Sequence, residues 1–354
     1  ARSAFFFAAR LREFRQGDGR LRTDIVSSAS DWPAAHGEGA GARRDDLALE
    51  VGRELEKSGR EAEALAFYAL GESAQCRERR IRLLYRTGQR DAARAALEGC
   101  MDSPGSDEEW VFANDFYMRK FDRKQTSVLT DTLRSAATID LDESLSGAPE
   151  RAAIDHYRRL GHDAYRAENT LWRSLFGLLF WEELFESDAT TAHSPFDGLP
   201  AALRDGTFYR LHRESIDDRL QSLTAVGTVT RTLLKTCTAR FGTPNGVFRW
   251  KRSMVEPLIA LLENSPPGAV PAVLRNMSSD YMNSRYGYPD LLVVDDDGAR
   301  FVEIKAEGDQ VRRNQMSRLR QLRDAGFRAD VVRVRWVLDP AQVYVVVDVE
   351  TTGG

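Results

Sequence analysis

The spacing of apolar residues changes at about residue 286, and this change divides the chain into two kinds of structure. From residue 44, apolar positions recur at intervals typical of amphipathic helices. After residue 286, short runs rich in β-branched residues are typical of strands, with one amphipathic helix expected at 309–325. These runs are LLVV (291–294), FVEIK (301–305), ADVVRVRWVL (329–338) and VYVVVDVE (343–350). We therefore expect an α+β protein, a helical body followed by a small α/β module at 286–354.

The helical body divides into three segments. Residues 1–43 open with closely spaced arginines, which we interpret as a solvated face, with a remnant DNA-backbone contact as the alternative. Within residues 44–145, a turn at Gly59 followed by an Ala-rich helix recurs at Gly88, an offset of 29 residues. Such helix pairs resemble tetratricopeptide repeats, which stack into a scaffold. Residues 146–285 form a second helical region that includes an apolar helix at 162–185.

Composition bears on the compartment and on possible partners. The 354 residues carry a net charge of −4, so nucleic-acid contacts would depend on local basic patches. The three cysteines are odd in number and lack paired spacing, so they indicate neither a zinc site nor a disulfide framework, and we expect a cytoplasmic protein. No signal-peptide order and no initiator Met are present, so we expect a fragment or a processed form. No stretch is long enough to span a bilayer.

The stretch GYPDLLVVDDDGARFVEIK (287–305) places charged residues in a hairpin that is expected to be buried. Side chains alternate between the two faces of a strand, so Glu303 and Lys305 share a face. Turn residues at 295–298 let the strands run back alongside each other, which brings Asp290 near Glu303. Two close carboxylates repel each other, and Mg²⁺ or Mn²⁺ relieves that repulsion. For an isolated Glu-x-Lys pair, a surface ion pair on an edge strand is the more common explanation.

Two further residues near this hairpin have a suitable chemistry. Lys305 is one of six lysines among 50 basic residues, and its compact ammonium group can hold a water or neutralise a phosphate in the transition state. Gln315 is spaced with Val311, Leu319 and Leu322 on the apolar face of the predicted helix. Because a polar amide on such a face needs a partner, we expect Gln315 to point toward the sheet.

Glu168 lies near the start of the apolar helix expected at 162–185, on a face shared with Leu171, Trp172 and Leu175. An acid there is either favoured by the helix dipole or directed inward as a ligand. From this pattern alone we interpret Glu168 as a structural residue.

Together these residues resemble a known nuclease pattern. Pro289 and Asp290, followed after twelve residues by Glu303 and Lys305, resemble the PD-(D/E)xK nucleases, and KAEGDQVRRNQ (305–315) resembles their VRR-NUC branch. AENTLWRSLFGLLFWEELF (167–185) resembles the Fanconi-associated nuclease family, of which this chain looks like a bacterial-type homologue. Two features depart from that family. The cysteines of its ubiquitin-binding zinc finger are missing from this sequence, and we expect a preceding DNA-binding domain to be absent or reduced to the arginine-rich start.

The resemblance implies a metal-dependent active site. Asp290, Glu303, Glu168 and the backbone carbonyl of Ile304 would hold one or two Mg²⁺ or Mn²⁺ ions, which polarise the phosphodiester and lower the pKa of an attacking water. Lys305 would orient that water, and Gln315 would brace the site. The catalytic set implied in this way is Asp290, Glu303, Lys305 and Gln315.

The resemblance also implies a structure-specific DNA endonuclease and 5′–3′ exonuclease. It would cut 5′-flap or branched DNA and take part in interstrand crosslink repair, on the bacterial nucleoid or in a eukaryotic nucleus. Arginines are expected to contact the DNA backbone, although a solvated position is the more common role for each one alone. They are Arg285, Arg312, Arg313, Arg77, Arg79, Arg80 and Arg82.

Two alternatives remain open. One is a Holliday-junction-resolvase-like nuclease on the same core. The other is a repeat scaffold whose module has lost activity and only binds DNA or protein, and the presence of Asp290, Glu303 and Lys305 argues against it.

Overall fold

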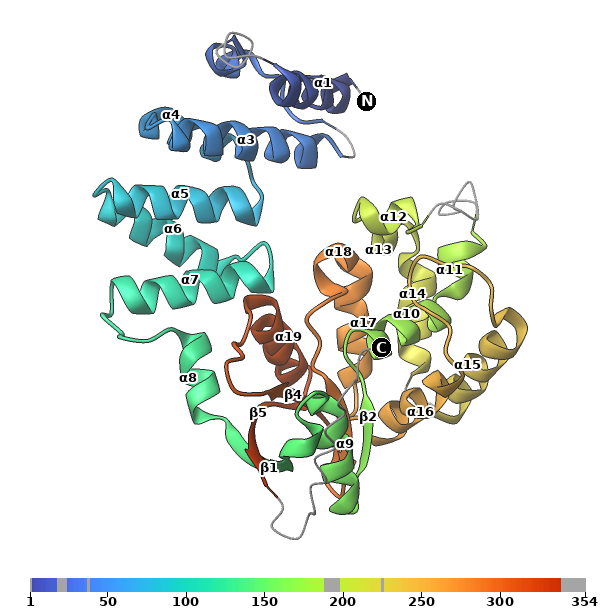
Figure 1. Cartoon of the computed structure of the whole chain (residues 1–354). Coiled ribbons are helices and arrows are strands. Elements are labelled where there is room, and N and C mark those ends of the chain that lie inside the picture. The colour runs from blue at the N-terminus through green and yellow to red at the C-terminus, as the bar shows by residue number, and fades with distance from the viewer. Residues whose placement is uncertain (1, 18–23, 37–38, 188–197, 224–225, 339–354) are drawn as a thin grey trace, which may run out of the picture.

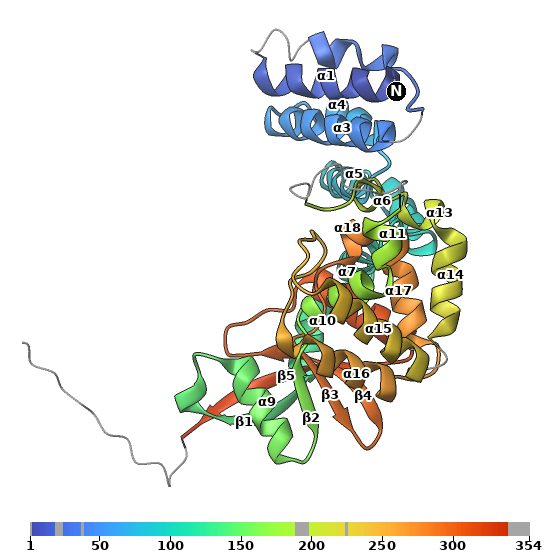
Figure 2. The ribbon, with the colours of Figure 1, turned by 90° about the vertical axis from the view of Figure 1, so that its right-hand side faces the viewer.

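The computed structural model describes residues 2–17, 24–36, 39–187, 198–223 and 226–338. A stack of helices at the N-terminus leads to a C-terminal part built around a β-sheet (Figures 1 and 2). The stack contains α1 (Arg2–Gln16), the 3₁₀ turn η1 (Ala29–Asp31), α3 (Ala40–Lys57), α4 (Glu61–Leu70), α5 (Ala74–Arg86), α6 (Arg90–Asp102) and α7 (Asp107–Lys120). The next helix, α8 (Val128–Ser135), connects the stack to the sheet.

The helix pairs α3–α4 and α5–α6 share the same turn. A glycine with positive φ ends the first helix of each pair, Gly59 at 78° and Gly88 at 82°. Glycine adopts this conformation without a Cβ clash, and the next N–H can then close the helix end. Arg60 N donates to Leu55 O over 2.9 Å, and the equivalent bond follows Gly88. The repeat predicted from the two glycines is therefore present in the structure.

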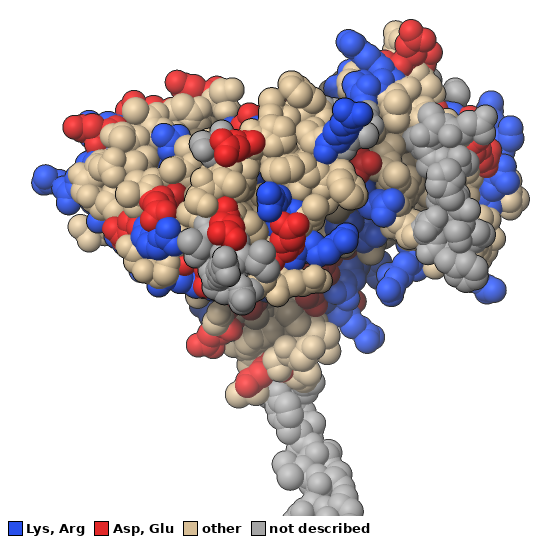
Figure 3. Space-filling model, turned by 90° about the horizontal axis from the view of Figure 1, so that it is seen from above, with Lys and Arg blue, Asp and Glu red and all other residues tan. Residues whose placement is uncertain are grey.

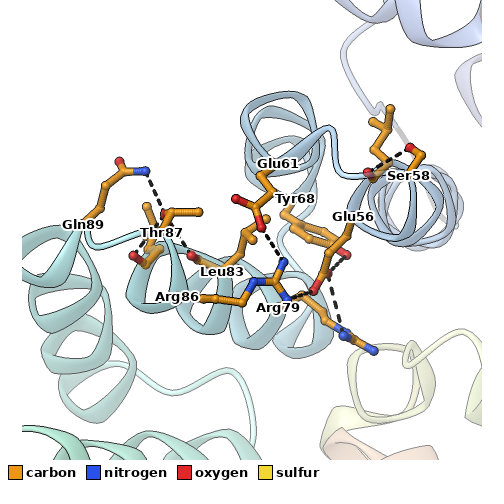
Figure 4. A network of polar contacts seen from close by, with 11 residues as sticks. Glu56, Ser58, Glu61, Tyr68, Arg79, Leu83, Arg86, Thr87 and Gln89 are labelled. Carbon is orange, nitrogen blue, oxygen red and sulfur yellow. Dashed lines mark hydrogen bonds and ion pairs between the residues drawn. The ribbon is translucent and has the colours of Figure 1, made fainter.

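A polar network joins α3, α4 and α5 (Figure 4). Glu56 accepts hydrogen bonds from Tyr68 Oη at 2.8 Å and from Arg86 at 3.0 Å. Arg79 lies 3.7 Å from the same carboxylate, and Arg86 also pairs with Glu61 at 3.1 Å. Two arginines and one tyrosine thus converge on a single carboxylate, which links three helices of the stack.

One mixed sheet of five strands has the order β1-β5-β4-β3-β2. β5 pairs in parallel with both β1 and β4, whereas β3 pairs antiparallel with β4 and β2. The strands are β1 (Ala137–Asp142), β2 (Asp163–Arg166), β3 (Leu291–Asp295), β4 (Gly298–Lys305) and β5 (Arg328–Val337).

The prediction that all strands follow residue 286 is wrong for β1 and β2. Both precede that residue and lie in regions that were expected to be helical. Their sequences, ATIDLD and DAYR, are short and carry little strand signal. They become strands because β5 and β3 offer backbone partners across the sheet. The strand expected at 343–350 lies outside the described residues.

Helices cover both faces of the sheet. On one face, Ala153 of α9 (Pro149–Arg159) belongs to the same buried cluster as Val302 of β4. On the other face, Trp172 of α10 (Thr170–Leu179) packs on Phe301 with ring centroids 5.7 Å apart, and Leu319 of α19 (Arg313–Asp324) joins that cluster. Because side chains alternate along a strand, the odd-numbered residues of β4 face the α10 and α19 layer.

The segment 162–185, expected to be one apolar helix, is divided. β2 ends at Arg166, a turn follows, and α10 begins at Thr170. Asn169 has φ 51°, a left-handed conformation that a helix of L-residues cannot continue through. Glu168 therefore lies in a turn rather than on a helix face. The helix expected at 309–325 is α19, which begins at Arg313.

The remaining helices pack around α10 and complete the C-terminal part. They are α11 (Trp181–Phe185), α12 (Ala201–Arg204), α13 (Phe208–Leu211), α14 (Arg213–Ser222), α15 (Val226–Arg240), α16 (Val255–Asn264), α17 (Ala269–Ser279) and α18 (Tyr281–Ser284), with the 3₁₀ turn η3 (Arg252–Met254). A further 3₁₀ turn, η2 (Glu143–Leu145), packs with α9 on the other face of the sheet. Among the described residues, no helix is long and apolar enough to cross a membrane.

Candidate active site

Asp290 and Glu303 lie side by side at the start of β3 and near the end of β4. The antiparallel register pairs Leu291 with Val302, so Asp290, one residue earlier, lies beside Glu303, one residue later. Both carboxylates are buried, with exposed fractions of 9% and 1%. Asp290 Oδ2 accepts a hydrogen bond from Ile304 N at 2.8 Å, which orients the aspartate along the edge of β4.

Lys305 and Gln315 complete a polar cluster around Glu303. Lys305 Nζ lies 2.8 Å from Glu303 Oε1 and 3.1 Å from Gln315 Oε1. Gln315 Nε2 donates to Glu303 Oε1 at 2.5 Å, and Gln315 Oε1 also accepts from Arg312 N at 2.9 Å. The amide of Gln315 therefore bridges the carboxylate and the ammonium from the first turn of α19, as its helical register predicted.

The electrostatics of the two carboxylates are unfavourable without a further cation. Burial, followed by the charge of Asp290, raises the pKa of Glu303 to about 8. Burial also raises the pKa of Asp290 to about 6, although the hydrogen bond from Ile304 N opposes the rise. Glu303 Oε2 is buried and has no hydrogen-bond partner among the described residues. A buried oxygen of this kind needs a partner, and a metal ion would supply one.

Glu168 lies at the edge of this cluster, in the turn between β2 and α10. The backbone N–H groups of Ala167 and Glu168 donate to Asp290 O at 2.7 and 3.1 Å. The charge of Glu168 contributes to the raised pKa values of both Asp290 and Glu303. Its side chain is 42% exposed and pairs with Arg166 at 3.2 Å.

Glu168 is near the pair of buried carboxylates but does not close a metal cage with them. Within the described residues, no three His, Cys, Asp or Glu side chains are grouped closely enough to hold a metal ion. Asp290 and Glu303 offer carboxylate oxygens of the kind that hard cations bind, and such ions usually take further ligands from backbone carbonyls, waters or phosphate oxygens.

Asn169 is a structural determinant of the site that sequence reasoning missed. Its Oδ1 accepts from Gly287 N at 2.7 Å and from Tyr288 N at 3.3 Å, so it ties the turn that carries Glu168 to the segment just before Asp290. Gly287 has φ +91°, and a Cβ there would lie 2.8 Å from the backbone oxygen of Asn314. Two sequence features could have indicated this contact. They are an asparagine before an apolar helix and a glycine two residues before the Pro-Asp pair.

Four of the seven arginines expected to contact DNA are held in ion pairs within the protein. Arg77 forms a bidentate pair with the buried Glu109, and Arg79 joins the network around Glu56. Arg82 and Arg313 share Glu78, at 2.9 and 2.5 Å. The Arg313 pair connects α5 to α19, and thus the helix stack to the candidate site.

The other three of these arginines are placed differently. Arg80 and Arg312 are exposed. Arg285 packs its guanidinium over the ring of Tyr286, 4.9 Å from its centroid. These three remain available for contacts with a polyanion.

Two cavities flank the carboxylates, and sequence reasoning located neither. One, of about 630 Å³, has three carboxylates in its wall, Glu168, Asp155 and Glu256, together with five cations, which are Arg151, Arg158, Arg166, Arg249 and Lys251. The other, of about 590 Å³, has Lys305 in its wall. Their cations come from distant parts of the chain, so no local sequence pattern marks them. Buried carboxylates, a lysine and flanking cations suit binding of a divalent metal ion together with a phosphate chain.

Comparisons with known proteins match both the fold and this region. The VRR-NUC domain model matches residues 226–336. The Fanconi-associated nuclease 1 homolog of Arabidopsis thaliana is 28% identical over 194 residues, which make up 52% of this chain and 22% of that protein. The homolog of Pseudomonas aeruginosa is 28% identical over 192 residues, or 54% of this chain and 34% of that protein. The chain thus spans about a fifth to a third of the length of these curated relatives.

A solved structure resembles the chain over nearly its whole length. A crystal structure of paFAN1 bound to 2-nt 5′-flap DNA with a gap has a TM-score of 0.74 at 24% identity, and the match covers 95% of this chain and 62% of that one. At this identity the likeness concerns the fold, and it confirms the predicted α+β class.

Proposed function

Because this chain carries a VRR-NUC domain and belongs to the Fanconi-associated nuclease family, we propose that it is a metal-dependent, structure-specific DNA nuclease. Its substrates would be 5′-flap or branched DNA, cut by endonuclease and 5′–3′ exonuclease action during interstrand crosslink repair on the nucleoid or in a nucleus. One observation carries the proposal. The buried Asp290 and Glu303 stand beside Lys305, and one carboxylate oxygen of Glu303 has no hydrogen-bond partner among the residues that the structure describes.

The residues present fit a divalent cation of the Mg²⁺ or Mn²⁺ type. Asp290, Glu303 and the backbone carbonyl of Ile304 would hold it, and Glu168 would join them by leaving its ion pair with Arg166. When bound, the ion would neutralise charge on the phosphodiester and lower the pKa of a coordinated water. The raised pKa values of both carboxylates support this assignment, because their main cause is burial, and a bound cation would stabilise the charged forms that burial disfavours. Glu303 Oε2, which has no hydrogen-bond partner among the described residues, could bind the ion directly.

Lys305 would position the attacking water or a phosphate oxygen. An ammonium group has three N–H donors, and two of them are directed to Glu303 and Gln315. The third is available to a water or a phosphate oxygen that enters the site. Gln315 limits the movement of Lys305, because its own amide is held by Glu303 and by Arg312 N. The role of Gln315 is therefore positioning.

DNA would be bound mainly through its phosphates, by cations spread over several elements. Seen from above, several Lys and Arg side chains gather near the middle of the molecule (Figure 3). Over the left part of this view the two signs are mixed (Figure 3). Of the arginines predicted from the sequence, Arg80, Arg285 and Arg312 are the proposed contacts. The five cations of the first cavity and Arg134 and Arg333 of the second lie beside them, whereas Arg335 is held by Asp140. Phosphate contacts suit an enzyme that recognises DNA shape rather than sequence.

A cleavage assay on a 5′-flap duplex tests the proposal. With Mg²⁺ or Mn²⁺, wild type should cut near the flap junction, and chelation should abolish cutting. Asp290→Ala and Lys305→Ala should each lose on the order of 100-fold or more in rate, as expected when charge stabilisation of a transition state is removed. Asp296→Ala, in the exposed turn of the same hairpin, is the matched control and should cut like wild type.

The same assay separates the alternatives. Faster cutting of an intact four-way junction than of a flap would favour the resolvase-like nuclease. DNA binding without any cutting, in wild type and variants alike, would favour the inactive scaffold and contradict the proposal.

A further inference from the structure

Lys305 has a second cation beside it on the sheet. The parallel register of β4 and β5 pairs Lys305 with Arg333, and the register of β5 and β1 pairs Arg333 with Thr138. Register partners project from the same face of a sheet, and neighbouring strands lie about 4.8 Å apart. Arg333 therefore emerges next to the proposed catalytic lysine, one strand further from Glu303.

Lys305 and Arg333 open into the same cavity of about 590 Å³. The helix α8 lies against β5 (Figure 1). Its Arg134 contributes to the wall of this cavity. The wall contains four cations, Arg134, Lys305, Arg333 and Arg335, and two carboxylates, Glu307 and Asp309. Asp309 is engaged locally, because its Oδ2 accepts from Ala306 N at 2.9 Å and closes the turn after β4. The balance of charge in the cavity favours an anion.

Arg333 differs from its neighbour Arg335, although both are exposed on the same face of the same strand. Arg335 is held by Asp140 in a bidentate pair, with both contacts at 2.6 Å. Within the part of the chain that the structure describes, no ion pair holds Arg333. The charge of Lys305 is already shared with Glu303 at 2.8 Å. Arg333 and Arg134 are thus the cations of this cavity that can serve a ligand from outside.

We propose that Arg333, assisted by Arg134, binds a phosphodiester next to the scissile one in the strand being cut. The proposal rests on the nuclease function proposed above and adds a phosphate subsite to it. A guanidinium group binds a phosphate through two parallel hydrogen bonds, which sets position as well as adding affinity. Arg333 is a positioning residue in this scheme. By holding the neighbouring phosphate, it places the scissile phosphodiester over Asp290, Glu303 and Lys305.

A linkage-by-linkage charge removal tests the subsite. The cut position is first mapped with wild type on a 5′-flap duplex. A set of the same duplexes then carries one uncharged methylphosphonate at each of the two linkages on either side of the cut. Single-turnover rates and KM are measured with Mg²⁺ or Mn²⁺ for wild type, Arg333→Ala, Arg333→Lys, Arg134→Ala and Arg335→Ala. Thermal unfolding of each variant monitors folding.

At one linkage the loss of the phosphate charge and the loss of Arg333 should not add. Arg333→Ala should slow cutting of the unmodified duplex about tenfold or more, the size expected for a lost hydrogen bond to a charged group. A methylphosphonate at that linkage should slow wild type by a similar factor and Arg333→Ala by less than about twofold, because the contact is already absent. Arg333→Lys should recover part of the rate, Arg134→Ala should show a smaller coupling at the same linkage, and Arg335→Ala should match wild type.

Two results would overturn the subsite while leaving the nuclease intact. In one, wild type and Arg333→Ala lose the same factor at every linkage. In the other, Arg335→Ala is as defective as Arg333→Ala. If wild type cuts nothing with either metal, the proposed function fails separately. The same duplexes then give binding affinities in Ca²⁺, and a lack of coupling there would also overturn the subsite.

Discussion

Gln315 donates its side-chain amide to Glu303 Oε1 over 2.5 Å and accepts from Lys305 Nζ over 3.1 Å. One amide therefore sets the orientation of the carboxylate and of the ammonium group. Residues that orient the ligands of a metal or the groups that hold a water affect rate more than they affect binding of the substrate.

Gln315→Met should therefore lower kcat by about 10- to 100-fold and leave KM within about threefold, the range typical of groups that orient a metal site. The methionine keeps the volume of the side chain but cannot hold Glu303 or Lys305. Gln310→Met, at an exposed position before α19, is the control and should be neutral. Steady-state kinetics on a 5′-flap duplex measure both constants. Equal losses in kcat and 1/KM would contradict a positioning role.

In metal-free protein, Asp290 and Glu303 should make the free energy of unfolding fall as pH rises. Folding raises their pKa values to about 6 and about 8, above the ordinary values of 3.8 and 4.5. At pH values between the ordinary and the folded pKa of each group, the folded state therefore binds more protons than the unfolded state. The stabilising contribution is present below the ordinary values and is lost as pH rises through the folded values.

Urea unfolding in EDTA at pH 5 and pH 8 measures this contribution. Glu303→Gln should remove most of the fall that wild type shows, because an amide does not titrate in this range. Added Mn²⁺ should restore the stability of wild type at pH 8, since it binds the folded state preferentially. Asp296→Asn serves as the control for surface charge. If wild type and Glu303→Gln showed the same pH dependence, the raised pKa of Glu303 in the folded protein would be contradicted.

Gly287→Ala should destabilise the protein more than Gly308→Ala. Both glycines have positive φ, +91° and +86°, so each alanine incurs a left-handed strain of about 1–2 kcal/mol. Only at Gly287 would the new Cβ also lie 2.8 Å from the backbone oxygen of Asn314, whereas nothing lies within 4 Å at Gly308. Urea denaturation of the two variants gives the difference directly. Equal losses would show that the segment before Asp290 can move away from α19.

Arg313→Ala should affect the connection between the helix stack and α19 more than it affects DNA binding. Arg313 pairs with Glu78 at 2.5 Å, and both side chains are partly exposed, so a double-mutant cycle with Glu78→Ala should give a coupling of about 1 kcal/mol or less. Arg312→Ala removes an exposed neighbouring arginine that forms no ion pair within the described ranges. It should weaken DNA binding and reduce the slope of affinity against salt concentration. Fluorescence polarisation over a salt series distinguishes the two variants, and a larger salt effect for Arg313→Ala would reverse the assignment.

The part of the site that lies within one short stretch could be predicted from the sequence. Asp290, Glu303 and Lys305 belong to one hairpin, and a strand period of two with a short turn leaves few ways to arrange them. Gln315 follows on the next helix, whose 3.6-residue period determines the face it occupies. The 29-residue repeat of the helix stack was visible for the same reason, since a glycine turn recurs between regular helices.

Contacts between distant segments were decided only by the tertiary structure. β1 and β2 are too short to be recognised alone and exist because β5 and β3 pair with them. Glu168 was expected on a helix, but the left-handed Asn169 places it in a turn beside Asp290. The ion pair of Arg313 with Glu78 depends on which helices meet. The placement of Arg333 beside Lys305 depends on how β4 pairs with β5. Local periodicity thus determined how Asp290, Glu303 and Lys305 are arranged in their hairpin. Packing between distant elements determined what surrounds the hairpin, because side-chain partners across a fold leave no pattern in the chain.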